Sequence, residues 1–148
     1  MRQRVHKQKG ASILEFLVII PVLFTLAFTA IEFGAIFTRL NTLTKSVQAA
    51  TRYLSDSSVN KSNTDTQKAI AINLIKYGSV GTGAQILPGV FNAPTISNPD
   101  PNHVQMSVVY GHTPILGLAL SNLLKFLGGS GINLSFALNA SSVMRYAQ

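Results

Sequence analysis

The chain has 148 residues, which is room for one modest domain. Twelve Lys and Arg against five Asp and Glu give a net charge of +7, yet only 11% of the residues are charged, under half of the roughly 25% usual for soluble domains. Five carboxylates leave little material for acid–base catalysis, and the lack of cysteine excludes thiol nucleophiles, disulfides and thiolate zinc sites. We therefore expect a protein that is not an enzyme and that holds no cofactor and no metal.

Much of the positive charge lies at the N-terminus. Arg2, Arg4, Lys7 and Lys9 stand there without an acidic residue, so +4 of the net +7 precedes residue 10. A basic chain can bind nucleic acid, but neither an aromatic RNA-binding motif nor a zinc finger accompanies this cluster. Because the apolar segment that follows gives the cluster another explanation, we expect no nucleic-acid partner.

Residues 11–37 are almost entirely apolar, with Glu15 and Glu32 as the charged exceptions. As a helix, residues 13–37 are about 37 Å long, enough to cross a hydrocarbon core of about 30 Å with some tilt. A secretory signal has a shorter apolar region and a small-residue cleavage site, and no clear site of that kind follows Phe37. The alternative, a helix buried in a core, would need a larger protein around it. We predict a transmembrane helix over 11–37.

The positive-inside rule sets the orientation of this helix only weakly. Four basic residues precede the helix, and Arg39, Lys45 and Arg52 follow it. The rule therefore slightly favours a cytoplasmic N-terminus. The compactness of the N-terminal cluster adds weight, because a folded C-terminal domain can be translocated whatever its charge.

The helix is expected to continue over 38–55 in amphipathic form. Its apolar stripe recurs at spacings of three and four residues: Leu40, Leu43, Val47, Ala50 and Leu54. Polar and basic residues, Arg39 and Lys45 among them, lie between these positions, as on a helix with a water-facing side. A Ser- and Asn-rich segment then interrupts the pattern.

Residues 56–148 are expected to form a small α+β head domain with an antiparallel sheet. A helix should run from Thr64 or Asp65 to Tyr77 and end at Gly78. The residues expected on its inner face are Ala69, Ile70, Leu74 and Tyr77. A Gly-, Pro- and Asn-rich connection over 78–102 follows. Alternating apolar residues predict strands at 104–110 and 132–140, the second with a bulge or an end near Ser141.

Between these strands, residues 114–127 form an apolar stretch that has two interpretations. As a core helix packed on the sheet it needs no function. As an interfacial helix on lipid or on a partner it would explain why Lys125 is its only charge. The sequence leaves this choice open.

Other patterns that suggest chemistry are weak. The glycine clusters at 78–83 and 128–131 are not followed by Lys-Ser or Lys-Thr, which excludes a P-loop. His103 and His112 flank a strand with Asp100 nearby and are conceivable metal ligands. We expect them to be exposed residues at the strand ends, and we find no Ser/His/Asp arrangement.

Glu15 and Pro21 are the informative residues within the apolar segment. If the chain is cut after Gly10, the new α-amino group at Ala11 lies one helical turn from Glu15 on the same face. The two groups can pair within one chain, or between staggered chains, which would fix axial register; the alternative is an unpaired Glu15 stabilised by the helix macrodipole. Pro21 should bend the helix without ending it.

The N-terminal residues resemble a known family. Lys9-Gly10-Ala11-Ser12-Ile13-Leu14-Glu15-Phe16, with its basic leader, resembles the class III signal of type IV pilins and pseudopilins. More narrowly, residues 10–22 and Ile31-Glu32-Phe33-Gly34 resemble the TadE-like proteins of the tight-adherence (Flp, type IVb) pilus system. Looser matches follow in order at Tyr77-Gly78, Leu87-Pro88-Gly89, residues 104–110 with Pro114, and Ser142-Val143-Met144-Arg145.

The resemblance implies a minor pseudopilin that takes part in assembly or initiation of the pilus. Residues 1–10 would be a leader removed by a prepilin peptidase between Gly10 and Ala11, with Glu15 and Phe16 acting in assembly. The implied location is the inner membrane, with a cytoplasmic N-terminus and a periplasmic head, possible incorporation in the pilus, and contacts to lipid. The implied partners are the peptidase, TadF-like pseudopilins, the Flp major pilin and the pilus platform.

Chain length separates this protein from some members of the system. The Flp major pilin is much shorter and the TadG-like relatives are far longer, so both TadE and its near relative TadF fit this chain. The alternative function is an uncleaved, membrane-anchored periplasmic accessory protein of a pilus or secretion machine.

Overall fold

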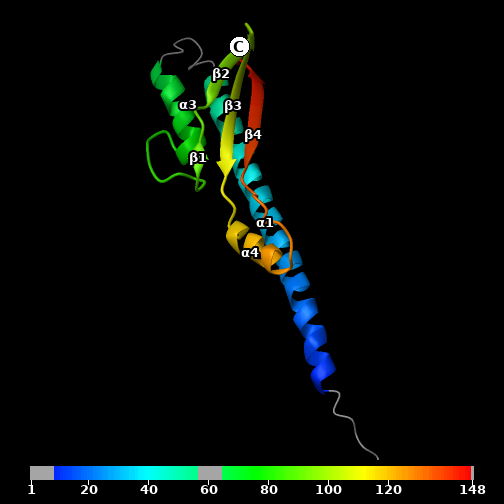
Figure 1. Cartoon of the computed structure of the whole chain (residues 1–148). Coiled ribbons are helices and arrows are strands. Elements are labelled where there is room, and N and C mark those ends of the chain that lie inside the picture. The colour runs from blue at the N-terminus through cyan, green and yellow to red at the C-terminus, as the bar shows by residue number, and fades with distance from the viewer. Residues whose placement is uncertain (1–8, 57–64, 148) are drawn as a thin grey trace, which may run out of the picture. The chain divides into compact units, whose positions relative to one another are not determined.

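A computed structural model describes residues 9–56 and 65–147, with side chains from residue 13 onward (Figure 1). Most of the expected leader and most of the expected Ser- and Asn-rich break therefore lie outside the described residues. The chain divides into two compact units: Met1–Gly34 with Pro114–Leu134, and Ala35–Thr113 with Ser135–Gln148. We expected all of 56–148 in one head, whereas residues 114–134 group with the N-terminal part of the chain.

One continuous helix, α1 (Lys9–Ser55), contributes to both units, and it continues through Pro21. Proline cannot donate the helical hydrogen bond and crowds the preceding turn. One turn further on, the Thr25 hydroxyl donates to the Pro21 carbonyl at 2.8 Å, and the Thr29 hydroxyl donates to the Thr25 carbonyl at 2.7 Å. Such bonds give hydroxyl groups a partner inside an apolar helix. The helix therefore does not end at Pro21, and the bend there stays a prediction.

The second unit combines the C-terminal half of α1 and a short helix with a four-stranded antiparallel sheet, so the expected α+β class is confirmed. Its other elements are α3 (Asp65–Tyr77), β1 (Val90–Phe91), β2 (Thr95–Asp100), β3 (His103–His112) and β4 (Phe136–Arg145). The long strand β3 is central. It pairs with β4 along one edge and with β2 and then β1 along the other.

Two strands lie within the segment that we expected to be a connection. β1 has only two residues, and β2 is polar and contains Pro99, so neither carries an apolar alternation. A proline is tolerated in β2 because this strand lies at a sheet edge. The register of β2 against β3 shifts between Ser97 and Asp100, so the bulge of this sheet is in β2.

The expected interruption near Ser141 is wrong. β4 begins at Phe136 and pairs with β3 without a break, from His112↔Phe136 to His103↔Arg145. Leu138 and Ala140 are buried and Val143 is exposed. Val143 is out of phase with the apolar set because it lies on the outer face of a regular strand, and such a position needs no bulge.

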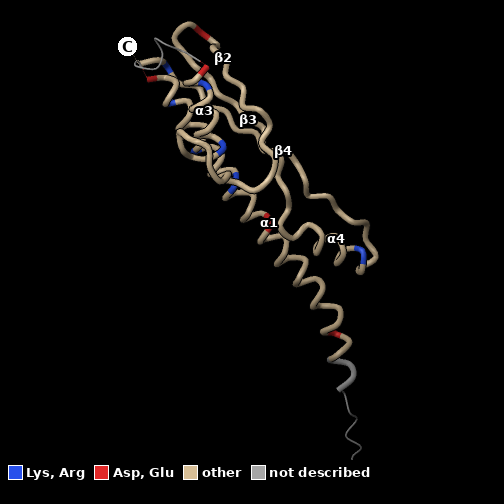
Figure 2. The backbone as a smooth tube through the Cα atoms, turned by 90° about the vertical axis from the view of Figure 1, so that its left-hand side faces the viewer, with Lys and Arg blue, Asp and Glu red and all other residues tan. Residues whose placement is uncertain are grey.

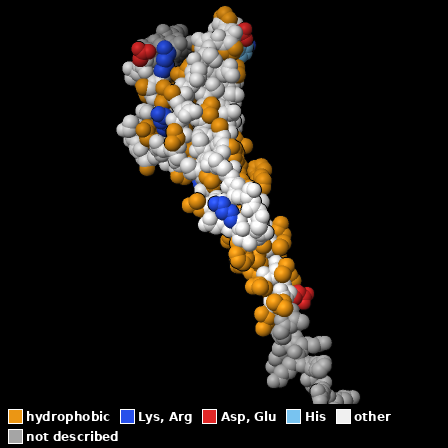
Figure 3. All heavy atoms as spheres, in the orientation of Figure 1, with side chains coloured by type: hydrophobic (Ala, Val, Ile, Leu, Met, Phe, Trp, Pro, Cys, Tyr) orange, Lys and Arg blue, Asp and Glu red, His pale blue; other side chains and the backbone are white. Residues whose placement is uncertain are grey.

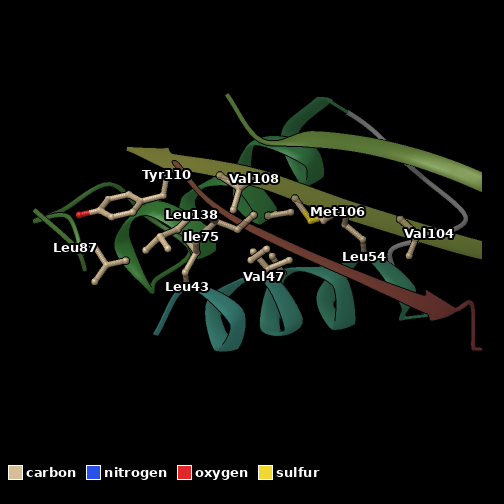
Figure 4. Packing of buried hydrophobic residues seen from close by; sticks show 13 residues of the cluster. Leu43, Val47, Leu54, Ile75, Leu87, Val104, Met106, Val108, Tyr110 and Leu138 are labelled. Atoms are coloured by element: carbon tan, nitrogen blue, oxygen red, sulfur yellow. The ribbon is translucent and has the colours of Figure 1, made fainter. Parts of the chain in front are cut away.

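The core of this unit lies between α1, α3 and the inner face of the sheet (Figure 4). The predicted stripe of α1 is confirmed, with Leu40 partly buried and the other four positions fully so. Every second residue of β3 is buried: Val104, Met106, Val108 and Tyr110. The remaining core members come from α3, the connection and β4: Ala71, Ile75, Leu87, Leu138 and Ala140.

The inner face of α3 is rotated from the expected one. Ala71 and Ile75 are buried and Leu74 packs against them, whereas Ala69 is exposed. The alternating Ala and Ile of residues 69–72 place apolar side chains on more than one side of the helix. The apolar pattern alone therefore does not choose between these faces.

The residues that follow β4 are hydrogen-bonded to two other parts of this unit. The Ala147 amide donates to the Ser55 carbonyl at 2.8 Å, at the last residue of α1, and the Tyr146 amide donates to the Asn102 carbonyl at 2.9 Å. The residues that follow β4 are thereby fixed to α1 and to the turn before β3.

Candidate membrane anchor and its helix cap

The N-terminal half of α1 exposes most of its large apolar side chains, and one face that includes Pro21, Phe28 and Glu32 is buried or partly buried. From Ile13 to Phe37 most of these side chains are exposed (Figure 3). Among the described residues, one helix is long and apolar enough to cross a membrane, Ile13–Ser55, with a mean hydropathy of 2.4 in its most apolar window and none of that window buried. In water such a surface is unfavourable, whereas lipid tails solvate it.

The sequence-predicted site residues lie along the start of this helix. The backbone of Gly10 and Ala11 is in the first turn of α1, while the side chains of residues 9–12 are outside the described ones. Glu15 and Phe16 are exposed on α1. Cleavage at Gly10, pairing of Ala11 with Glu15, and a role of Phe16 in assembly stay predictions.

The second carboxylate of the apolar segment, Glu32, has a structural partner. Its side chain is only 3% exposed. The Ile115 amide donates to both carboxylate oxygens at 3.1 Å, and the Leu116 amide donates to Oε2 at 2.9 Å. These two residues directly precede helix α4 (Gly117–Phe126).

Glu32 acts as a cap supplied from a different helix. The first amides of a helix lack acceptors within the helix, and the helix N-terminus attracts negative charge. Leu116 occupies the N-cap position of α4 and makes no side-chain capping bond. Glu32 is therefore the carboxylate that ties α1 to the start of α4, within the first unit.

The sequence analysis included Glu32 in a motif but did not predict that it caps α4. The sequence nevertheless contains an indication of this role. An acid inside an apolar span needs a polar partner, and the 114–127 stretch begins with Pro114-Ile115-Leu116, which offers no Ser, Thr, Asp or Asn as a cap next to the helix.

The second unit contains a buried arginine at the end of its central strand. Arg39 is buried, and its guanidinium Nη1 lies 2.9 Å from His112 Nδ1 and donates to the Thr113 carbonyl. Arginine only donates, so Nδ1 of His112 is the acceptor and the proton of the neutral ring is on Nε2. The His112 ring lies 5.1 Å from the Phe136 ring between centroids.

Both of these polar residues were expected at the surface, and that expectation is wrong. His112 is 2% exposed although it ends a strand, because β3 continues its alternation of buried and less buried positions to its last residue. Arg39 stands next to the apolar stripe, so the end of β3 and the chain after it satisfy its guanidinium instead of water.

Tyr110 closes the same end of the core. Its hydroxyl donates to the Pro88 carbonyl, and its ring lies 5.1 Å from that of Phe91. Burial raises the pKa of Tyr110 above its ordinary value of 10.0, and the positive charge of Arg39 partly opposes this.

The histidines do not assemble a metal site. His103 begins β3 and His112 ends it, so the length of the strand separates them. His103 pairs with Asp100, its Nδ1 lying 3.4 Å from the carboxylate Oδ2. The described part of the chain holds no group of three or more His, Asp or Glu placed to bind a metal ion.

Comparison with known proteins gives one family. Residues 10–52 match the family model described as TadE-like protein. The match begins at the expected cleavage position and covers nearly all of α1, so it confirms the TadE-like resemblance over this helix and is consistent with a protein of the Tad pilus system. Neither the comparison with curated proteins nor the comparison with solved structures gave a match.

Proposed function

Because residues 10–52 carry the TadE-like family match, we propose that the protein is a minor pseudopilin, TadE- or TadF-like, that takes part in assembly or initiation of a tight-adherence pilus. The observation that carries the proposal is that the matched segment coincides with the helix that exposes its apolar side chains. The role is structural: the protein binds lipid and other subunits and catalyses no reaction.

The apolar half of α1 serves as the single inner-membrane anchor. Its basic leader stays in the cytoplasm and the head domain lies in the periplasm. This orientation rests on the cluster of basic residues ahead of the helix and on the family resemblance.

A prepilin peptidase cleaves the leader between Gly10 and Ala11. Glu15 then becomes the fifth residue of the mature chain, and its exposed carboxylate stands among exposed apolar side chains. A carboxylate within a membrane costs about 2.5–3.5 kcal/mol near the helix centre and less near the interface. The Ala11 amine of this chain or of the next subunit offsets that cost, which fixes the axial register between subunits.

The mass of the mature protein tests the proposal. Full-length chain is produced in cells with and without the peptidase, extracted from membranes and measured by intact-mass spectrometry. We expect loss of residues 1–10 in the presence of the peptidase and retention in the Gly10→Leu variant. Gly34→Leu is the matched control, because a Cβ at Gly34 meets no atom within 4 Å. A leader retained in the unchanged chain would favour the uncleaved accessory protein.

Subunit capture tests the role of Glu15. Glu15→Leu makes the span more apolar, so membrane insertion should persist. We expect co-purification with other pilins and piliation both to fall at matched protein levels. Leu14→Ala, at a neighbouring position that is also exposed, is the control. Normal complexes and normal piliation for Glu15→Leu would contradict the register role.

A further inference from the structure

We propose that α4 and its flanking residues, 114–127, form a second membrane contact that lies in the interface of the bilayer crossed by α1. The occupant of the exposed face of α4 is lipid. This inference rests on the proposed membrane anchor and adds to it a surface that the family match, over residues 10–52, does not include.

The exposed side of α4 is mostly apolar, with Asn122 and Lys125 as its polar members. Leu118 is 84% exposed and Phe126 is 76% exposed, and Ile115 before the helix and Leu127 after it are exposed as well. With about 3.6 residues per turn, positions 115, 118, 119, 122, 125 and 126 lie on one side of a helix. Leu120 on the opposite side is buried. α4 therefore buries one side inside its unit and leaves the other side uncovered by the residues that the structure describes.

The position of Glu32 along α1 places the start of α4 at a defined depth. The helix from Ile13 to Glu32 is roughly 28 Å long at the usual rise per residue, close to the hydrocarbon thickness of about 30 Å. Glu32 lies near the C-terminal end of the predicted span over 11–37 and so close to the second boundary of the hydrocarbon. The amides of Ile115 and Leu116 bind the Glu32 carboxylate, so α4 begins at that boundary.

The charges of the segment favour lipid over a protein partner. Residues 114–134 contain one ionisable side chain, Lys125, and no acid. Lys125 lies in the last turn of α4, and Figure 2 shows no acidic residue along α4 itself. An interfacial helix buries apolar side chains below the headgroups, while a lysine lays its methylene stem along that surface and its ammonium among lipid phosphates. The composition and exposure of α4 fit that arrangement.

Fluorescence quenching by brominated lipids tests the inference. The chain has no tryptophan, so a single introduced tryptophan reports one position. The full-length chain is reconstituted in phosphatidylcholine–phosphatidylglycerol vesicles with bromine near either the start or the end of the acyl chains. The variants are Leu118→Trp and Phe126→Trp on α4, Phe24→Trp in the anchor, and Val143→Trp on the outer face of β4.

We expect the two α4 variants to lose tryptophan emission most with bromine near the start of the acyl chains (shallow quenching). Phe24→Trp should lose it most with bromine near their end (deep quenching), and Val143→Trp should keep its emission. Adding Glu32→Ala to Phe126→Trp should reduce the shallow quenching, whereas adding Glu15→Ala should not.

Quenching of Phe24→Trp without quenching of either α4 variant overturns the inference and leaves the anchor intact. A blue-shifted but unquenched Phe126→Trp also overturns it, because the face is then covered by protein. If Phe24→Trp is not quenched, the proposed membrane anchor is contradicted, and with it the proposed function.

Discussion

The two halves of α1 belong to one helix but present opposite surfaces. Between residues 13 and 34 most of the large apolar side chains are exposed, and the charged residues are two acids, Glu15 and Glu32. Past Gly34 a single apolar stripe is buried against the sheet and basic residues occupy other positions. The halves differ in apolar content and in how their apolar residues are distributed around the helix. This distribution determines whether lipid or protein can cover them.

The polar groups follow the same division. In the second unit Arg39 is satisfied by acceptors at the end of β3, and in the first unit Glu32 is satisfied by donors at the start of α4. Each residue is a buried charge on α1 that binds a segment far along the chain. Both units therefore use a charged side chain of α1 to position a later segment of the chain. They differ in whether the apolar side chains of α1 are buried or exposed.

The largest effect should separate the head core from the anchor. Met106→Ala removes a fully buried side chain of β3, and we expect the head to lose about 2–5 kcal/mol of unfolding free energy. Phe24→Ala, at an exposed position of α1, should change that value by less than about 0.5 kcal/mol. Urea unfolding in detergent, followed by fluorescence of the four tyrosines, all of which lie beyond residue 52, reports the head alone. Equal losses for both variants would contradict the division of α1 into an anchor half and a half that packs in the head.

The next effect concerns the buried guanidinium. Arg39→Ala leaves His112 Nδ1 and the Thr113 carbonyl without this donor, and an unsatisfied buried group costs about 1–3 kcal/mol. Arg52→Ala, at an exposed position of the same helix, should stay within about 0.5 kcal/mol. The same urea unfolding measures both. If Arg52→Ala lost as much unfolding free energy as Arg39→Ala, the stability of the head would depend on the positive charge of α1 and not on the burial of the Arg39 guanidinium.

A smaller and more local effect is expected in the first unit. Glu32→Ala removes the cap of α4 and should cost about 0.5–2 kcal/mol of local helix stability. Hydrogen exchange of amides 117–126 should speed up, while exchange in β3 stays unchanged because the core of the second unit does not include α4. Glu15→Ala is the control. Unchanged exchange in α4 would rule out Glu32 as its cap.

The smallest effect is a pH dependence of the head. The pKa of Tyr110 is raised in the folded state, so its contribution is fully present below the ordinary value of 10.0. As the pH rises above that value the unfolded chain ionises first, and stability is lost progressively toward the folded-state pKa.

Tyr110→Phe tests this. At neutral pH we expect a loss of about 0.5–1.5 kcal/mol from the missing hydrogen bond to the Pro88 carbonyl. The alkaline decline of the melting temperature should become shallower than in the unchanged chain. Tyr146→Phe, whose hydroxyl bonds Asn98 at the surface, should keep the full decline. If the melting temperature fell with pH as steeply in Tyr110→Phe as in the unchanged chain, the raised pKa of the buried Tyr110 would not be the cause of the alkaline decline.

Strong periodicity made most of the fold predictable. The stripe of α1, the limits of α3 and the alternation in β3 were read from spacing alone, and the structure confirms them. The weak strands β1 and β2 were missed because they are stabilised by backbone pairing to β3 rather than by side-chain pattern.

The polar contacts were predictable only in part. Glu32 and Arg39 bind residues more than seventy positions away, and no local spacing encodes such a partner. The sequence did indicate that Glu32 is unusual, since an acid in an apolar span is costly. The two open interpretations of residues 114–127 reflect the same limit, because an apolar helix face looks alike whether a sheet or a bilayer covers it.

The order of synthesis gives the pairing of β3 with β4 a further consequence. α1 is the first element to be synthesised. The apolar stripe that it contributes to the head stays exposed until β3 and β4 have been synthesised, because these strands cover it and α4 lies between them in the chain. The head can therefore complete its core only after β4 has left the ribosome. A chain stopped short of β4 would present an uncovered apolar stripe to the proteases that remove failed subunits.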